Sequence, residues 1–340
     1  MVGVYEDDPE VVEPAVRGRR MWPLASAPMR GVLGAVGRVL ITVGLLLLLF
    51  VAYQLWGTGI YQARAQDDLA RQFKQSLQRN PGAASTTSPA GPTTTSTTAA
   101  TPTAPTTLGP ITIPPQGDVI ARIGIPKIGV DQYVVEGVNV DDLRKGPGHY
   151  PTTQLPGHEG NSAIAGHRTT YGAPFGELDQ LQPGDQIVVV TVQGKFKYQV
   201  TDQRVVDPGE ISVLDPSPDP ARPGHDLATL TLTTCNPKYS ASQRLIVRAQ
   251  LDLTPDQLPL PRAPTPKGKA ATTIGGLSGE SSSRTPAILW GIVAAVIGLL
   301  WWLLFHRHPR WTTWFVGVVP FLAALFVCYV YVERLLPSNY

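Results

Sequence analysis

Cysteine is almost absent from this sequence, because its 340 residues contain only Cys235 and Cys328. Cys328 lies in an apolar C-terminal stretch that we expect in a membrane, which leaves Cys235 as the one thiol outside the hydrophobic segments. A domain with a single cysteine cannot form an internal disulfide, so its thiol is either idle or reactive. The shortage of cysteine therefore excludes a disulfide-rich scaffold and makes Cys235 a candidate reactive group.

An excess of charge of one sign is also lacking. Lys and Arg number 28 and Asp and Glu number 26, a formal net charge of +2 that gives no indication of nucleic acid binding. Residues 80–115 contain no charged side chain and are dominated by Thr, Pro, Ala and Ser. Such a segment has too little apolar surface to offset the entropy of ordering, so we expect an extended extracytoplasmic linker over residues 80–116.

Long apolar runs, in contrast, occur three times, at residues 39–60, 285–305 and 314–332. Each is long enough to cross the hydrocarbon core of a bilayer as a helix. Five arginines precede the first run, and the positive-inside bias therefore places residues 1–38 in the cytoplasm. A cleaved signal peptide is the alternative for this run, but the long tail before it and the lack of a small-residue cleavage site favour an uncleaved anchor.

The basic loop between the second and third runs, residues 306–313, is also expected in the cytoplasm. Both assignments leave the region between the first and second runs outside, so we predict a multi-pass protein of the cell membrane with an extracytoplasmic domain. The alternative for the last two runs is a buried helical pair of a soluble domain. The remaining predicted parts are a juxtamembrane segment with a short polar helix at 61–79, a folded domain at 117–253, a second linker at 254–284 and a tail at 333–340.

The folded domain contains short β-rich apolar runs, with Gly and Pro in nearly every gap between them. Seven or eight short strands with helical turns near 141–144 and 175–178 predict a mainly β fold, a closed β-barrel with short helices. The predicted strands are 119–125, 133–138, 162–165, 186–192, 196–206, 228–234 and 245–251.

The strand that leads to Cys235 alternates leucine and threonine. Alternation sets Leu230 and Leu232 on one face and Thr231, Thr233 and Cys235 on the other. If the leucines fill the barrel core, Cys235 lies at the end of the strand on the outer wall, where a surface groove could reach it. The alternative is a small buried cysteine without a chemical role.

Two residues could assist a reactive thiol at a strand end. His167 ends an apolar run and Arg244 begins another, and a thiol, an imidazole and a guanidinium together suit acyl transfer. Arg248 is expected to be a surface charge. The remaining histidines of the domain are expected to be bystanders, and they lack cysteines at metal-ligand spacing, so neither a metal nor a cofactor is predicted. These histidines are His149, His158 and His225.

The segment Thr231-Leu-Thr-Thr-Cys235 resembles the sortase signature Thr-Leu-x-Thr-Cys. His167, in Ala-Gly-His-Arg, precedes it and Arg244-Leu-Ile-Val follows it, which is the family order of His, Cys and Arg over residues 117–253. The tract Gly146-Pro-Gly-His-Tyr150 is similar to class E, the housekeeping sortases of high-GC Gram-positive bacteria. The resemblance implies a sortase-like β-barrel in which His167, Cys235 and Arg244 are the catalytic residues.

In functional terms, the resemblance implies a membrane-anchored cysteine transpeptidase that cleaves a Leu-Ala-x-Thr-Gly-like sorting signal between Thr and Gly. The Cys235 thiolate would form a thioacyl enzyme, His167 would protonate the leaving amine, and Arg244 would stabilise the oxyanion or hold the substrate backbone. An amine of a lipid II-like peptidoglycan precursor would then join the surface protein to the cell wall. The implied partners are thus surface proteins with a C-terminal sorting signal, the wall precursor and the membrane.

Substrate contacts are expected at Tyr150, Thr233 and Thr234. The Tyr150 hydroxyl could bond the backbone amide that alanine has and proline lacks, which would favour alanine in the signal. Two other functions remain open: a pilin-polymerising, class C-like sortase, to which a C-terminal membrane hairpin would be suited, and a non-catalytic wall-binding β-barrel. A peptidoglycan L,D-transpeptidase is disfavoured, because its Ser-His-Gly-Cys type motif is absent.

Overall fold

The computed structural model describes residues 27–79, 113–253, 258–263, 281–305 and 311–335. By its internal contacts the chain divides into two units, Met1–Leu49 and Phe50–Tyr340, and the helix α1 (Ala27–Ala52) crosses the boundary between them. The predicted N-terminal tail, Thr/Pro-rich linker, cytoplasmic loop and C-terminal tail lie largely outside the described residues, as does most of the second linker.

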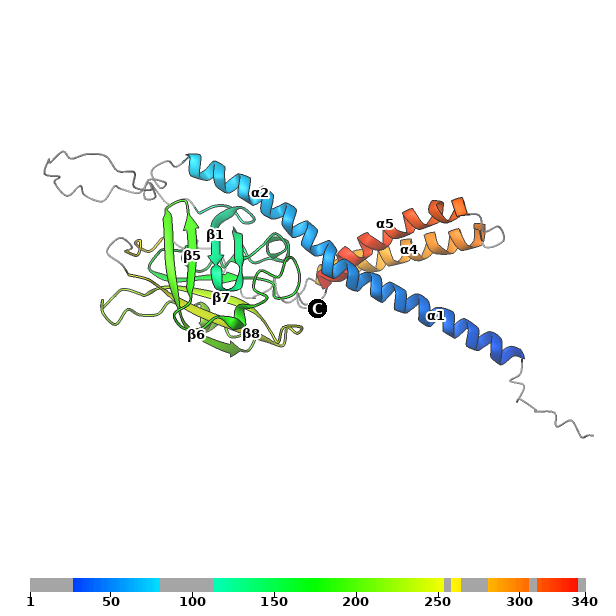
Figure 1. The fold of residues 1–340 in the computed structure, drawn as a ribbon, viewed down its shortest axis with the longest axis horizontal. Coiled ribbons are helices and arrows are strands. Elements are labelled where there is room, and N and C mark those ends of the chain that lie inside the picture. The colour runs from blue at the N-terminus through cyan, green and yellow to red at the C-terminus, as the bar shows by residue number, and fades with distance from the viewer. Residues whose placement is uncertain (1–26, 80–112, 254–257, 264–280, 306–310, 336–340) are drawn as a thin grey trace, which may run out of the picture. The chain divides into compact units, whose positions relative to one another are not determined.

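The second unit contains a closed barrel of eight strands in the order β1-β2-β3-β4-β7-β8-β6-β5, with β5 pairing back to β1 (Figure 1). The pairs β2–β3 and β4–β7 are parallel, and the other six are antiparallel. The prediction of a closed seven- to eight-stranded barrel is confirmed. The strands are β1 (Val119–Ile125), β2 (Val130–Glu136), β3 (Gly148–His149), β4 (Gly160–Ala165), β5 (Gln186–Thr191), β6 (Gly194–Val206), β7 (Ala228–Asn236) and β8 (Gln243–Leu251).

Alternate side chains of the strands fill the barrel interior, as the sequence pattern predicts. On β7, Leu230 and Leu232 are fully buried in a core that also contains Ile123 and Val247. Each such side chain contributes about 1.5–3 kcal/mol to folding when it is removed from water. Cys235 lies on the opposite face of β7 and belongs to a second, smaller buried cluster. The sheet therefore separates the core from the candidate site.

Short helices lie near both places where the sequence indicates helical turns. They are α3 (Val140–Leu143) and the 3-10 helix η4 (Leu178–Gln180). A further 3-10 turn, η5 (Ile211–Leu214), lies in the long connection between β6 and β7. The candidate site lies among α3, η5 and the carboxyl ends of β4 and β7, as described below.

The segment expected to be juxtamembrane forms a helix, α2 (Thr58–Arg79), that is packed onto the barrel. Its apolar residues recur every four positions, and Leu69 and Phe73 are buried against β1 and β2. Gln66 accepts a hydrogen bond from the backbone N–H of Tyr133 at 2.7 Å and donates to the carbonyl oxygen of the same residue at 3.0 Å. Because β3 pairs with β2 only near the end of β2, Gln66 satisfies backbone groups that would otherwise lack a strand neighbour.

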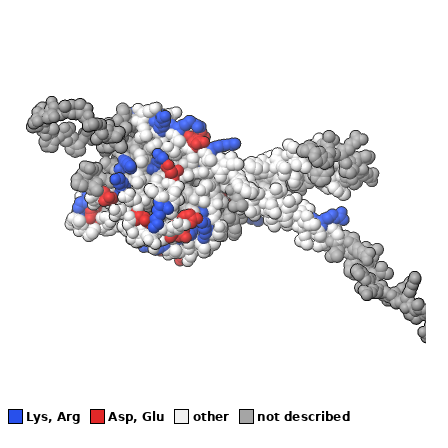
Figure 2. Space-filling view, in the orientation of Figure 1, with Lys and Arg blue, Asp and Glu red and all other residues white. Residues whose placement is uncertain are grey.

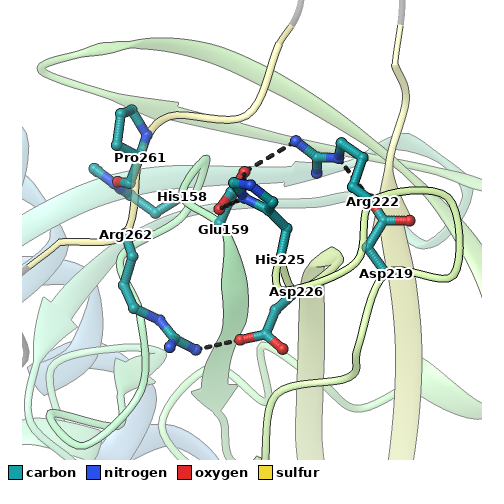
Figure 3. Close-up of polar contacts among 8 residues, drawn as sticks. All are labelled: His158, Glu159, Asp219, Arg222, His225, Asp226, Pro261 and Arg262. Atoms are coloured by element: carbon teal, nitrogen blue, oxygen red, sulfur yellow. Dashed lines mark hydrogen bonds and ion pairs between the residues drawn. The ribbon is translucent and has the colours of Figure 1, made fainter.

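Part of the expected second linker also returns to the barrel. The backbone N–H of Leu260 donates to Gly157 at 2.8 Å, and its carbonyl oxygen accepts from Glu159 at 2.9 Å. Figure 3 shows the side chains around this return, where Arg262 forms an ion pair with Asp226. The packed domain therefore includes α2 and residues 258–263 in addition to residues 117–253.

Two C-terminal helices, α4 (Arg284–Phe305) and α5 (Trp311–Leu335), form a hairpin. Their apolar stretches of 22 and 20 residues have mean hydropathies of 2.4 and 2.0 and are long enough to cross a membrane. The visible surface of this hairpin carries almost no charged side chain, whereas charges of both signs are scattered over the barrel (Figure 2). A Cβ on Gly317 would overlap the ring of Trp301, so the two helices approach closely where the side chain is smallest.

The first expected span falls on α1. Among the residues of α1 whose side chains the structure describes, the apolar part is Val36–Ala52. It is followed by a π-helical turn, η1 (Tyr53–Gly57), and then by α2. Two of the three expected spans are thus present by length and composition, and the N-terminal one stays a prediction.

Replacing Phe73 by alanine should lower the free energy of unfolding by about 3 kcal/mol, because the change leaves a cavity between α2 and the barrel. Lys74→Ala, one residue further on the exposed side of the same helix, is the matched control and should stay within about 0.5 kcal/mol. Urea denaturation of the full chain in detergent measures both values. Equal stability of the two variants would contradict the packing of α2 on β1 and β2.

Candidate active site

The parallel pairing of β4 with β7 brings two of the three predicted catalytic residues together. Ala165 pairs with Thr233, and the N–H of Gly166 donates to the carbonyl oxygen of Thr233 at 3.0 Å. His167 and Cys235 each lie two residues beyond this pair, so the common register sets them at the same level on neighbouring chains.

Arg244 joins this row from the other side of β7. In the antiparallel ladder between β7 and β8, Arg244 is the direct partner of Cys235. Its guanidinium Nη1 donates to the carbonyl oxygens of Ala241 at 2.8 Å and Gln243 at 2.9 Å. The sequence prediction that His167, Cys235 and Arg244 are neighbours therefore agrees with strand register, and Cys235 lies in the middle.

Gly166 is required by a close approach just before His167. A Cβ at this position would lie 2.5 Å from the ring of Phe175, which is buried in the barrel core. The N–H of Phe175 donates to the carbonyl oxygen of His167 at 3.0 Å, and the Thr234 hydroxyl donates to that of Gly166 at 2.8 Å. The backbone on both sides of the imidazole is thus fixed by contacts from two segments, β7 and the loop that carries Phe175.

Cys235 is fully buried, which corrects the expectation that a surface groove reaches it. It packs in the cluster of Val138, Leu143 and Tyr150, with Leu214 and Ala241 against the cluster from two loops. The alternation pattern correctly placed Cys235 on the face opposite the core leucines. It could not show the cover, because α3, η5 and the β7–β8 loop are distant from β7 in sequence or irregular in conformation.

Burial and the nearby positive charges have opposite effects on the pKa of Cys235. Burial raises the pKa of the Cys235 thiol to about 11, and the positive charges of Arg244 and Arg168 act in the opposite direction. Arg168 is itself buried, and its Nη1 donates to the carbonyl oxygen of Cys235 at 3.0 Å and to the side chain of Asn236 at 2.8 Å. In the closed site the neutral thiol is therefore the stable form.

Arg168 is a residue that sequence reasoning missed. It follows His167 directly in the sequence, and its Nη2 lies 3.1 Å from Asp179 while its Nη1 donates to the backbone carbonyl oxygen of Cys235. A buried arginine requires partners that balance its charge. The adjacent position in Ala-Gly-His-Arg was the one available signal, and it does not reveal which way the side chain turns.

His167 lies against an aromatic ring. The centroids of His167 and Tyr171 are 5.1 Å apart with an angle of 39° between the planes, and both side chains are buried. Tyr171 adopts a left-handed backbone conformation with φ of 49°, which is uncommon for a bulky residue. Nothing in the sequence pattern indicated this contact.

The three expected substrate residues lie near the thiol in different ways. The Tyr150 hydroxyl is 3.1 Å from that of Thr233, and either group could be the donor. Burial raises the pKa of Tyr150 to about 12, so its hydroxyl keeps its proton. The Thr234 hydroxyl, in contrast, donates to the carbonyl oxygen of Gly166, so this side chain links the end of β7 to the backbone that follows β4.

Arg248 and the bystander histidines occupy places apart from this row. Arg248 is half-buried, and its Nη2 lies 3.4 Å from the carbonyl oxygen of Val213, so it is not a freely solvated charge. His158 bonds Pro261 and Gln193 through its two ring nitrogens. His225 Nδ1 lies 2.9 Å from the carboxylate of Glu159, and Figure 3 shows both histidines beside the returning segment.

His149 is buried between the carboxylate of Glu136, at 2.8 Å, and the carbonyl oxygen of Gln154, at 2.9 Å. Both ring nitrogens of His149 are thus engaged in hydrogen bonds that stabilise the loop that carries Tyr150. Among the described residues, no group of three or more His, Cys, Asp and Glu side chains is arranged to hold a metal ion.

Alkylation of Cys235 by iodoacetamide should be slow at neutral pH and should rise about tenfold per pH unit up to about pH 10, because the thiolate is the reactive form and the pKa is raised. In the urea-unfolded chain the same modification should level off above the ordinary thiol pKa of about 8.5. Peptide mapping separates Cys235 from Cys328. A plateau below pH 8 in the folded protein would show that the thiolate is stabilised and would contradict this electrostatic picture.

Comparison with known proteins agrees with this geometry. Residues 123–252 match the family model of the sortase domain. The chain is 34% identical over 228 residues to sortase SrtE1 of Streptomyces coelicolor, which covers 63% of this chain and 55% of that protein. It is 34% identical over 124 residues to sortase D of Bacillus subtilis, which covers 36% and 58% of the two proteins. The chain thus spans somewhat more than half the length of these curated relatives.

One solved structure is matched over nearly its whole length. The crystal structure of sortase E1 from Streptomyces coelicolor with a tripeptide in the active site shares 34% identity, with a TM-score of 0.37, over 46% of this chain and 96% of that one. The chain therefore carries a sortase domain, the domain of a family of cysteine transpeptidases, and its similarity to sortase SrtE1 supports class E.

Proposed function

We propose that this protein is a membrane-anchored transpeptidase that cleaves a Leu-Ala-x-Thr-Gly-like sorting signal between Thr and Gly and transfers the carboxyl end to an amine of a peptidoglycan precursor. The observation that carries this proposal is the alignment of an imidazole, a thiol and a guanidinium at the ends of β4, β7 and β8. Family membership supports the reaction class, and the particular signal and acceptor are part of the proposal.

In the first half-reaction, the Cys235 sulfur attacks the Thr carbonyl carbon, and a tetrahedral intermediate forms. Arg244 is the donor for the oxyanion or the substrate backbone, and His167, as an imidazolium, gives its proton to the leaving glycine amine. The C–N bond breaks and a thioester with Cys235 remains. In the second half-reaction the acceptor amine attacks the thioester, and His167 takes up the proton that this amine loses.

The reacting pair has to be thiolate and imidazolium together. With ordinary pKa values of about 8.5 for Cys and 6.5 for His, only a small fraction of the pair has this form near neutral pH. The raised pKa of Cys235 makes the fraction smaller still in the closed site. A substrate that displaces part of the apolar cover would reduce the desolvation of the thiol, and would thereby lower its pKa.

The cover also determines how a peptide enters. Leu143 from α3, Leu214 from η5 and Ala241 from the β7–β8 loop lie over or beside Cys235, and all three belong to short or irregular segments. Loops that move while a rigid sheet holds the reactive groups are a common arrangement in enzymes. We expect the peptide to replace these side chains along the outer faces of β4 and β7.

The location of the protein is part of the same proposal. With α4, α5 and the apolar part of α1 as membrane spans, the barrel lies on the outer side of the cell membrane, where surface proteins and wall precursors meet. The partners are then proteins with a C-terminal sorting signal and a lipid II-like amine.

The direct test incubates the full chain in detergent with a Leu-Ala-x-Thr-Gly peptide and an amine acceptor. We expect a ligated product that ends in Thr joined to the amine, identified by mass spectrometry. A peptide in which the Thr–Gly bond is replaced by an N-methyl amide is the matched control and should give none. Absence of both cleavage and ligation with Ala- and Pro-containing signals would reject the proposal in favour of a binding module.

Cys235→Ala should abolish cleavage and ligation while the barrel stays folded, since alanine fills most of the space of the thiol. His167→Ala and Arg244→Ala should each lower kcat/KM by at least about 100-fold, as expected when one member of a catalytic unit is removed.

Matched controls for these variants are His225→Ala and Arg122→Ala, which remove exposed side chains from surface ion pairs. Both should stay within about twofold of the wild type. His158 is unsuitable as a control, because its two hydrogen bonds are buried. Turnover of a quenched fluorescent peptide measures all variants, and an equal loss in controls and targets would refute the assignment.

Tyr150 and Thr233 should act together in the choice of the second signal residue. If the Tyr150 hydroxyl donates to Thr233, its oxygen keeps lone pairs for a substrate N–H that alanine has and proline lacks. Tyr150→Phe should therefore reduce the preference for Ala over Pro by about tenfold, and Thr233→Val should reduce it in the same direction. The ratio of kcat/KM values for the two peptides is the measurement, and an unchanged ratio in Tyr150→Phe would exclude the hydroxyl.

A further inference from the structure

A buried polar cluster connects the end of α5 with the wall of the candidate active site. Its members are Glu333 on α5, Arg144 at the end of α3, and Tyr171, and at most 9% of each residue is exposed. Arg144 Nε donates to the Tyr171 hydroxyl at 2.7 Å, and that hydroxyl donates to Glu333. Arg144 Nη2 lies 3.9 Å from the Glu333 carboxylate. Arg144 Nη1 also lies 3.6 Å from the exposed carboxylate of Asp141, so Glu333 supplies the buried negative charge of the cluster.

Both sides of the cluster face the reacting groups. The ring of Tyr171 packs on that of His167, with 5.1 Å between centroids. Leu143, which precedes Arg144, is part of the apolar cover of Cys235. A change at Glu333 would therefore reach the imidazole through Tyr171 and the thiol through α3, although Glu333 touches neither.

The backbone of Tyr171 supplies a second, independent observation. Its φ of 49° is a left-handed conformation that is unfavourable for a non-glycine residue and persists only where the surroundings impose it. Here two helices supply these surroundings. Thr58, at the start of α2, accepts from the Tyr171 N–H at 3.3 Å, and Glu333, near the end of α5, accepts from the Tyr171 hydroxyl. Such imposed strain beside a reactive group is a common feature of pre-organised sites.

We propose that Glu333 is a positioning residue, through which the C-terminal helical hairpin holds Tyr171 against His167 and α3 over Cys235. The hairpin is then a component of the active site in addition to its role as an anchor. The effect of Glu333 on turnover rests on the proposed transpeptidase function, whereas its effect on the cover of Cys235 does not.

The test uses the full chain in nanodiscs and the variants Glu333→Gln and Tyr171→Phe, singly and combined. Glu333→Gln keeps the shape of the side chain and removes the charge that balances Arg144. We expect each single variant to lower kcat about tenfold with KM within about twofold, and the double variant to be no slower than the slower single one, because the two groups form one unit. Glu159→Gln is the matched control, since it makes the same substitution in an ion pair with Arg222 that lies outside this cluster; it should stay within about twofold.

A readout that needs no peptide separates this proposal from the function. The rate of iodoacetamide modification of Cys235 at a fixed alkaline pH should rise at least about threefold in Glu333→Gln, since α3 is less firmly held, and should stay unchanged in Glu159→Gln. If the wild type ligates no peptide, the transpeptidase proposal fails and this rate alone decides. A normal kcat together with a normal modification rate in Glu333→Gln would overturn the proposal, and so would equal losses in Glu333→Gln and Glu159→Gln.

Discussion

The parallel ladder between β4 and β7 is the interaction on which the candidate site depends. Parallel strands end at the same edge of a sheet, so residues that follow them emerge side by side even when 68 positions separate them, as with His167 and Cys235. β8 adds Arg244 because an antiparallel neighbour begins where β7 ends. The core leucines on the inner face of β7 fix this register, since a slip of one residue would turn them outward.

The same sheet creates a conflict between protection and reactivity. Cys235 lies on the outer face, yet loops bury it in an apolar cluster, and burial raises the pKa of the thiol. A neutral, covered thiol is poorly nucleophilic, and it is also protected from oxidation, which proceeds through the thiolate. The chemistry we propose then requires that peptide binding displace part of this cover and lower the pKa of the thiol, so that the thiol becomes reactive when a substrate is present.

The sequence predicted those features that follow from periodicity or from a local motif. Alternation along β7 placed Leu230 and Cys235 on opposite faces, and Gly- and Pro-separated apolar runs indicated a closed barrel. It did not indicate β3, because two residues in Gly-Pro-Gly-His carry no alternation. Nor could it indicate the turn of Arg168 towards the Cys235 backbone or the contact between Tyr171 and Glu333, because these depend on tertiary geometry across 67 and 162 positions.

The packing of α2 changes the role that we expect for the Thr/Pro-rich segment. As a tether, a segment of this composition would set how far the barrel lies from the membrane. However, α2 precedes the segment and β1 follows it, and Leu69 and Phe73 of α2 pack against Val119 of β1. Both ends of the segment are therefore held by one folded unit, so its length adds only a slowly growing loop-closure cost. In the proposed membrane arrangement, the distance between the reactive thiol and the membrane would then be set by the start of α2 and the end of α5, which both meet the barrel at Tyr171.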